Sequence, residues 1–384
     1  MQKDNPLDIV KRNLFRLIRT GVFGDKEPLE PMTLSDWRAL LDLTLEQAVT
    51  GPAYDGLLQY VESKELDITV RMKLNWMSVV EGTDRVNKAI NGTLVSLFSI
   101  FKDARLRPVL LKGQGLATLY PSPLHRSCGD IDVFFPLPGQ ADQADQWARE
   151  NGTDCDDSDY KHLSYEWNGI KIENHHKMQV LLNKRLNRRL QDIVERELET
   201  NERAFVQIDG TTIEILPSTL NLLLIVLHIF HHALNEGVGL KQIVDLGVFL
   251  RKAGNIDYQK FREWMQELEM QKVADAIGGL CIQLFRFDKA DIPFMSAYDE
   301  KLTRRITSDI FKGGNMGNKV FGFKQQQGNL LAKKSKAMML HFCKSARYYH
   351  YCPREVVSNF TAKFAHSLKE TNRANPPHNT TTEA

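Results

Sequence analysis

Cysteines and long apolar runs are scarce in this chain of 384 residues. The five cysteines lie far apart and none forms a Cys-x-x-Cys pair, which argues against a disulfide framework and against a cysteine-based zinc site. The longest apolar stretch, residues 220–230, is interrupted by Asn221 and His228 and is far too short to span a membrane. The N-terminus lacks the basic-then-apolar layout of a signal peptide. We therefore expect a cytoplasmic protein without a membrane segment.

An excess of charge of one sign is absent as well. The formal net charge is +2, and 26% charged with 42% apolar residues is ordinary for a soluble globular protein. Such a chain has no overall attraction to nucleic acid or to an anionic membrane, so either partner would need a local basic patch. Two candidate patches, which a solvated helix face would also explain, are Lys184-Arg185 with Arg188-Arg189, and Lys333-Lys334-Ser335-Lys336.

The sequence pattern changes twice along the chain, from helical to strand-like and back to helical. The length allows two or three domains. Strand-like runs are confined to the middle, at residues 108–111, 131–135, 169–173 and 211–215, with a helical segment at 140–151. We predict an α+β fold in which a small mixed-sheet core is flanked by helical regions. The expected parts are an N-terminal helical region (1–104), the core (105–216), a C-terminal helical domain (217–368) and a disordered tail (369–384).

Within the helical regions, capping residues and helix breakers predict where helices begin and end. A helix is expected to start at Ser35-Asp36, and Gly51-Pro52 is expected to break the pattern. A second helix is expected over residues 68–104, and Ser218 is expected to cap a long apolar helix.

Asp130 and Asp132 are the leading candidates for chemistry. Alternation with period 2 puts both side chains on the same face of a strand, where the two carboxylates repel each other unless a cation lies between them. Gly129 before them and Val133 after them favour a buried strand end over a surface strand with outward aspartates. A pair of carboxylates in this position is typical of Mg²⁺-dependent phosphoryl or nucleotidyl transfer.

A glycine-rich turn precedes this strand. In the run Lys112-Gly113-Gln114-Gly115, glycines would let backbone N–H groups approach a phosphate, and Lys112 would add a point charge. An ordinary turn from strand to helix would give the same pattern, and the spacing is not that of a P-loop. Arg126 lies four residues before Asp130 and is a second candidate for the phosphates, or else a surface salt bridge.

A third carboxylate would complete a metal site and would orient or deprotonate an acceptor hydroxyl. Glu173 is the preferred candidate, because it stands near the end of a strand with His175 following on the same face. Glu214 lies in another strand-like run, residues 211–215, and is the alternative.

His228 and His232 are one helical turn apart, which is the spacing of a metal-binding pair. No Glu-rich companion sequence accompanies them, so zinc is not favoured there. They either face a cleft or serve the structure. Lys241 and Asp245, at positions i and i+4, follow at a junction between two expected helices.

The combined order of these motifs resembles the uncharacterised nucleotidyltransferase family of the DNA polymerase β-like superfamily. The similarity spans roughly residues 30 to 255, and the resembling segments are Leu111-Lys112-Gly113, Leu116-Ala117, Tyr120, Arg126, Gly129 to Val133, Ile172 to His175, Leu216-Pro217, His228, His232 and Gly239 to Asp245.

The resemblance implies transfer of a nucleoside monophosphate from an NTP, with release of pyrophosphate. It assigns Asp130 and Asp132 to Mg²⁺ (or Mn²⁺), Glu173 to the third acidic position, and the Lys112-Gly113 turn, with Gln114 following, to the phosphates. The usual glycine-serine or double glycine of the superfamily is Gly113-Gln114-Gly115 here. The spacing from Gly113 to Asp130 is also longer than the superfamily norm.

Three hypotheses therefore remain open. The leading one is an active transferase acting on a hydroxyl of a small molecule, sugar or protein, with His175, His228, His232 and Lys241 on the acceptor side. A toxin-like or tRNA-directed transferase would use the basic C-terminal helices to hold RNA. A non-catalytic nucleotide-binding protein of the same fold would bind NTP without turnover. The acceptor, the preferred base and the oligomeric state have no signature in the sequence.

Overall fold

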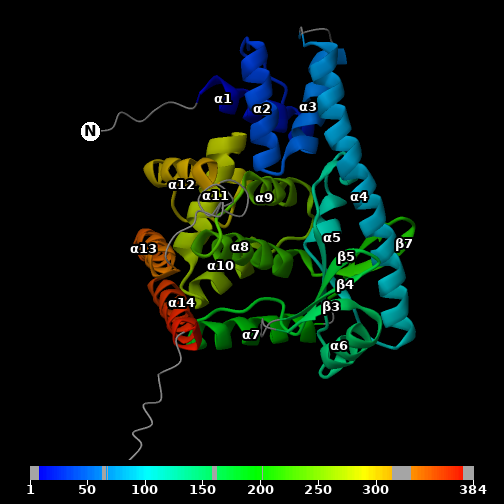
Figure 1. The fold of residues 1–384 in the computed structure, drawn as a ribbon, viewed down its shortest axis with the longest axis vertical. Coiled ribbons are helices and arrows are strands. Elements are labelled where there is room, and N and C mark those ends of the chain that lie inside the picture. The colour runs from blue at the N-terminus through cyan, green and yellow to red at the C-terminus, as the bar shows by residue number, and fades with distance from the viewer. Residues whose placement is uncertain are drawn as a thin grey trace, which may run out of the picture.

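The α+β architecture is confirmed by the structure, a computed structural model that describes residues 8–62, 66, 68–157, 162–200, 202–313 and 330–374. A mixed sheet lies in the middle of the chain, with helices before and after it in sequence (Figure 1). Its strands are β1 (Val109–Leu111), β2 (Asp130–Phe134), β3 (Thr153–Asp156), β4 (His162–Trp167), β5 (Ile170–His175), β6 (Ala204–Ile208) and β7 (Thr211–Ile215).

The seven strands lie in the order β3-β4-β5-β2-β1-β7-β6. β2 pairs in parallel with β5 and antiparallel with β1, so the strand of the two aspartates is central. The four strand-like runs predicted from sequence all form strands, whereas β3, β4 and β6 were not predicted. β4 and β5 are joined by the turn Asn168-Gly169, whose φ angles of 53° and 72° are those of a type I′ hairpin.

One face of the sheet is covered by α4 (Val70–Asp103) and α6 (Gln140–Asn151). Ile131 and Val133 of β2 point into this apolar layer, together with Ile172 of β5. Because side chains alternate along a strand, Asp130, Asp132 and Glu173 emerge on the opposite face. The alternation that was read from the sequence thus separates an apolar core from a polar site.

The N-terminal helices differ from the prediction in two details. The first is the start of α2, which begins at Leu34 because Thr33 and Asp36 form a capping box. The second is the Gly51-Pro52 pair, which does not break a helix but lies in the first turn of α3, where a proline needs no N–H partner. These elements are α1 (Ile9–Ile18), a π-helical turn (Arg19–Phe23), α2 (Leu34–Glu46) and α3 (Thr50–Glu62).

Helices and a 3₁₀ turn connect the strands, and a helical layer follows them. The connections are α5 (Gly113–Ala117), a 3₁₀ turn (Pro123–His125) and α7 (Lys184–Glu199). The later elements are α8 (Ser218–Leu234), α9 (Leu240–Lys252), α10 (Tyr258–Glu267), α11 (Gln271–Phe285), a 3₁₀ turn (Lys289–Asp291), α12 (Glu300–Gly313), α13 (Leu330–Tyr348) and α14 (Pro353–Ala374). Pro217, not Ser218, occupies the cap position of α8.

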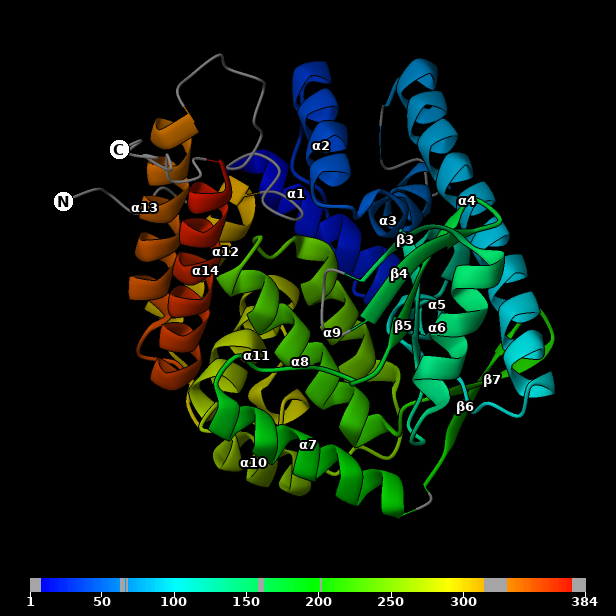
Figure 2. The same cartoon turned by 60° about the horizontal axis from the view of Figure 1, so that its bottom comes forward.

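The C-terminal helices lie side by side in both views of the fold, with α13 and α14 at the outer edge (Figures 1 and 2). α14 continues to Ala374, past the start of the segment that was predicted as a disordered tail, and the last ten positions lie outside the described residues. Within the described part of the chain, none of the helices is both long and apolar enough to cross a membrane.

Candidate active site

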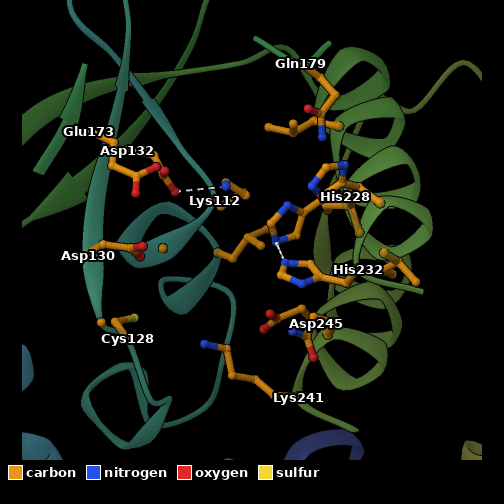
Figure 3. A pocket seen from close by; sticks show the side chains of 18 of the residues that line it. Lys112, Cys128, Asp130, Asp132, Glu173, Gln179, His228, His232, Lys241 and Asp245 are labelled. Atoms are coloured by element: carbon orange, nitrogen blue, oxygen red, sulfur yellow. Dashed lines mark hydrogen bonds and ion pairs between the residues drawn. The ribbon is translucent and has the colours of Figure 1, made fainter. Parts of the chain in front are cut away.

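A cavity of about 330 Å³ separates the polar face of the sheet from α8 and α9. Figure 3 shows Asp130, Asp132 and Glu173 on the sheet side and His228 and His232 on the opposite side, with Lys112 reaching in between. The cavity therefore brings together acidic residues and histidines of α8 that lie roughly 55 to 100 positions apart in the sequence.

The carboxylates are held in register by the pairing of β2 with β5, in which Asp132 lies opposite Glu173. The side chain of Asp132 is only 5% exposed, and its Oδ2 lies 3.0 Å from Lys112 Nζ. Burial raises the pKa of Asp132, but Lys112 and His175 outweigh burial and hold the pKa well below its ordinary value. The pKa of Asp130 is raised, first by the charge of Asp132 and then by burial. The repulsion between the two carboxylates therefore raises the pKa of Asp130, while Asp132 stays ionised.

Lys112 has a strained backbone, with φ 46° and ψ −129°, and Gly113 follows at φ 38°. A side chain with a Cβ rarely adopts such a conformation, and strain of this kind is concentrated at functional sites. These two residues turn the chain sharply from β1 into α5, and the Lys112 ammonium faces Asp132. The carboxylates of Asp132 and Asp130 raise the pKa of Lys112 although burial opposes them.

Glu173 lies beside one ammonium group and two imidazoles. Lys171 Nζ lies 2.5 Å from Oε1, while Nε2 of His162 and of His175 lie 3.4 and 3.5 Å from Oε2. Burial raises the pKa of Glu173, but the bond from His175 and the other partners lower it to about 2. His175 Nε2 also lies 2.9 Å from Asp132 Oδ1 and so links the two carboxylates.

Arg126 lines the cavity, but its guanidinium is already paired with Asp245. Nε lies 2.7 Å from Oδ1 and Nη2 lies 2.8 Å from Oδ2, in a bidentate pair whose side chains are 4% and 7% exposed. Tyr120 Oη donates to the same carboxylate at 2.7 Å. The structure therefore gives Arg126 a partner on α9, across 119 positions of sequence.

Gln114 is buried and is not among the residues that line the cavity. Its Nε2 donates to Asn91 Oδ1 at 2.7 Å, and its Oε1 accepts from Cys128 Sγ at 2.8 Å. These bonds fix α5 against α4 and support the cavity wall from behind.

Glu214, the alternative third carboxylate, lies on β7 outside the cavity. Arg107 and Arg203 both donate to it, and these bonds lower its pKa although burial opposes them. We expect Glu214→Gln to lower the free energy of unfolding by about 1.5–3 kcal/mol at neutral pH. Because the pKa of Glu214 is depressed in the folded state, its charge stabilises wild type at neutral pH. Wild type loses this stabilisation as pH falls through the folded pKa, whereas the variant has none to lose.

Urea denaturation of the Glu214→Gln variant and of wild type at neutral and at acidic pH measures this difference, which should shrink on acidification. Metal and nucleotide binding should be unchanged in the variant. A loss of metal binding would instead assign the third carboxylate to Glu214.

The histidines of α8 form a chain along the cavity. His228 Nε2 lies 3.0 Å from His232 Nε2, and His232 Nδ1 lies 2.9 Å from a carboxylate oxygen of Glu236. Burial, with Lys112 adding to it, holds the pKa of His228 well below its ordinary value, so His228 is neutral at neutral pH. Lys241 enters the cavity from the first turn of α9, and burial, followed by the charge of Arg126, lowers its pKa.

The first of the two basic patches predicted from sequence lies apart from this cavity. Lys184, Arg185 and Arg188 are exposed at the start of α7, and Arg189 donates to the carbonyl of Glu267. Lys333 to Lys336 belong to α13, but their side chains are outside what the structure describes.

His162 and Lys171 are site residues that the sequence reasoning missed. Both belong to the β4–β5 hairpin, in which His162 pairs with His175 across the Asn168-Gly169 turn. An Asn-Gly pair between two alternating runs is a strong hairpin signature. Counting back from that turn would have placed His162 opposite His175.

The comparison with protein families identifies the family of the chain. A family model described as an uncharacterised nucleotidyltransferase matches residues 33–286. The protein is thus an enzyme of the nucleotidyltransferase class. More particularly, because the match covers well over half of the chain, it belongs to this family of uncharacterised nucleotidyltransferases. No curated protein and no solved structure matches the chain.

Proposed function

We propose that this enzyme transfers a nucleoside monophosphate from an NTP to a hydroxyl of a small molecule, a sugar or a protein. In this reaction the acceptor oxygen bonds to the α-phosphorus, and the bond from the α-phosphorus to the bridging oxygen breaks to release pyrophosphate. The observation that supports the proposal is the convergence of Asp130, Asp132 and Glu173 on one wall of a cavity that has Lys112 in its middle.

The carboxylates fit a divalent ion such as Mg²⁺ or Mn²⁺. Magnesium takes oxygen ligands and needs only one or two carboxylates besides the substrate phosphates. The raised pKa of Asp130 also reflects a crowding of negative charge that a cation relieves. We assign Asp130 and Asp132 to the ion, with Glu173 in the third position. When bound, the ion neutralises the phosphates and aligns the attacking and leaving oxygens.

The remaining residues of the cavity act on the substrates. Lys112 supplies positive charge to the phosphates from its strained turn. His228, as a neutral imidazole, can accept a hydrogen bond from the acceptor hydroxyl, and we place His232 and Lys241 on the same side. His175 holds the two carboxylates of Asp132 and Glu173 in position. Arg126 positions α9 through Asp245 instead of contacting phosphate, and Gln114 supports the wall.

A labelling experiment tests this function. The enzyme is incubated with each NTP, Mg²⁺ or Mn²⁺ and a cell extract, with the label on the α-phosphorus in one series and on the γ-phosphorus in the other. We expect one class of extract molecule to gain label from the α-series only, because the β- and γ-phosphates leave together.

The Asp132→Asn variant is the control for contaminating transferases in this assay. Equal labelling by that variant, or labelling from the γ-series alone, would contradict nucleotidyl transfer by this site. Treatment of the extract with ribonuclease tests the RNA-directed alternative, whose binding would also fall steeply with salt.

A further inference from the structure

Two imidazoles stand beside Glu173, which is more than an oxygen-only metal site requires. Among the described residues, one group of three histidine, cysteine or acidic side chains has donor atoms all within 4.8 Å of one another. Its members are His162, Glu173 and His175. Nitrogen donors in this number are unusual for Mg²⁺, which prefers oxygen ligands and retained waters.

Two of the three donor separations match those around a tetrahedral ion. Glu173 Oε2 lies 3.4 Å from His162 Nε2 and 3.5 Å from His175 Nε2. Zinc bonds to nitrogen and oxygen of ~2.0–2.2 Å give ligand–ligand separations of roughly 3.3–3.6 Å at tetrahedral angles. An ion between Glu173 and either imidazole therefore fits the present side-chain positions, and the donor atoms of all three side chains lie within 4.8 Å of one another.

The fold holds these ligands in place before an ion binds. The antiparallel register pairs His162 with His175, and their rings lie 4.9 Å apart at an angle of 38°. Lys171 Nζ engages Oε1 of Glu173, which leaves Oε2 facing the two imidazoles. The side chains of His162, Glu173 and His175 are only 16%, 13% and 9% exposed. Partners of this kind orient metal ligands in the same way that outer-shell residues do at known sites.

We propose that His162, Glu173 and His175 form a second, His₂Glu centre for a nitrogen-preferring divalent ion of the zinc type, which shares Glu173 with the proposed oxygen-bound ion. Two imidazoles and one carboxylate suit Zn²⁺, Co²⁺ or Fe²⁺ better than Mg²⁺. All three residues line the cavity, so a fourth position on the ion is open toward it. This centre goes beyond the proposed function, since the free protein binds the ion without nucleotide and independently of Asp130.

In this structure Nε2 of His175 also lies 2.9 Å from Asp132 Oδ1. An ion bound to Nε2 would replace that hydrogen bond, while Asp132 would keep its ion pair with Lys112 at 3.0 Å.

The full-length protein is tested with Co²⁺ alone as a spectroscopic probe, followed by competition with Zn²⁺ in excess Mg²⁺. We expect one Co²⁺ per chain with the intense visible bands of a four-coordinate ion, displaced by stoichiometric Zn²⁺ but not by Mg²⁺. His162→Gln and His175→Gln should each weaken Co²⁺ binding by ~100-fold or more, since loss of outer-shell partners alone costs ~10–100-fold.

His176→Gln is the matched control, because His176 neighbours His175 but pairs with Asp145 at 2.7 Å outside the group. It should keep the Co²⁺ spectrum, as should Asp130→Asn, whose transfer activity is expected to be lost. If no transfer is detected with any acceptor while the Co²⁺ spectrum is present, the result counts only against the proposed function. Absence of the bands in wild type, or equal Co²⁺ affinity in His162→Gln and His176→Gln with all variants folded by circular dichroism, overturns the centre.

Discussion

Asp130→Asn is expected to abolish nucleotidyl transfer and, in metal-free buffer, to raise the melting temperature of the protein. The charge of Asp132 and burial raise the pKa of Asp130, so the ionised side chain destabilises the free protein at neutral pH. Asparagine removes that charge at almost the same volume. The same charge is what a bound ion needs, so stability and catalysis make opposite demands on this position.

Asp132→Asn separates the two effects. Its carboxylate has a depressed folded pKa and is paired with Lys112 and His175. Such a group stabilises the folded state above the unfolded pKa, and the stabilisation is lost as pH falls through the folded pKa. Removal of the charge leaves Lys112 and His175 buried without the carboxylate that they share, so this variant should melt several degrees lower than wild type.

Both variants should lose transfer by roughly 10³-fold or more, since a bound ion contributes several kcal/mol to the transition state. The measurements are labelled transfer with Mg²⁺ and thermal melting with a chelator present. We expect the melting temperature to rise in Asp130→Asn and to fall in Asp132→Asn, with the same loss of activity in both. A lower melting temperature in Asp130→Asn would show that Asp130 is a structural residue, and retained transfer in either variant would remove it from the ion site.

The sheet side of the site was predictable because its determinants are local. Period-2 alternation places Asp130 and Asp132 on one face, and the same alternation in β5 places Glu173 and His175 on the face that they share. The choice of Glu173 over Glu214 was based on polar residues at a strand end. The structure places Glu173 on the cavity and Glu214 between two arginines, while the metal role of Glu173 stays a prediction.

The opposite wall could not be predicted in the same way. Periodicity indicated the helices that carry His228 and Lys241, but it does not determine which sheet face a helix packs against. His162 is a different case, because an unused local pattern, the Asn168-Gly169 turn, determines its register. Arg126 and Asp245 had no local indication of their pairing, since contacts across such a separation depend on the packed fold.

The Arg126–Asp245 pair is the second position where a large effect is expected. Asp245→Asn leaves the Arg126 guanidinium buried without its counter-charge and should lower the free energy of unfolding by ~3–5 kcal/mol. Arg126→Met should cost a similar amount, because it leaves the Asp245 carboxylate buried with only Tyr120 as a hydrogen-bond donor. The double variant Arg126→Met/Asp245→Asn should lose much less than the sum of the two, since neither charge is then left alone.

The same double variant decides what Arg126 does for the substrate. If Arg126 serves to hold α9, a folded double variant keeps its affinity for Mg²⁺-NTP, because Lys112 and the carboxylates are untouched. If the guanidinium contacts the triphosphate, as the sequence suggested, the double variant recovers its stability but loses nucleotide affinity by more than tenfold. Urea denaturation and calorimetric titration with NTP give the two quantities on one protein preparation. We expect recovered stability with retained affinity for NTP. Nε and Nη2 of Arg126 both donate to the buried carboxylate of Asp245, so these donors are directed away from phosphate.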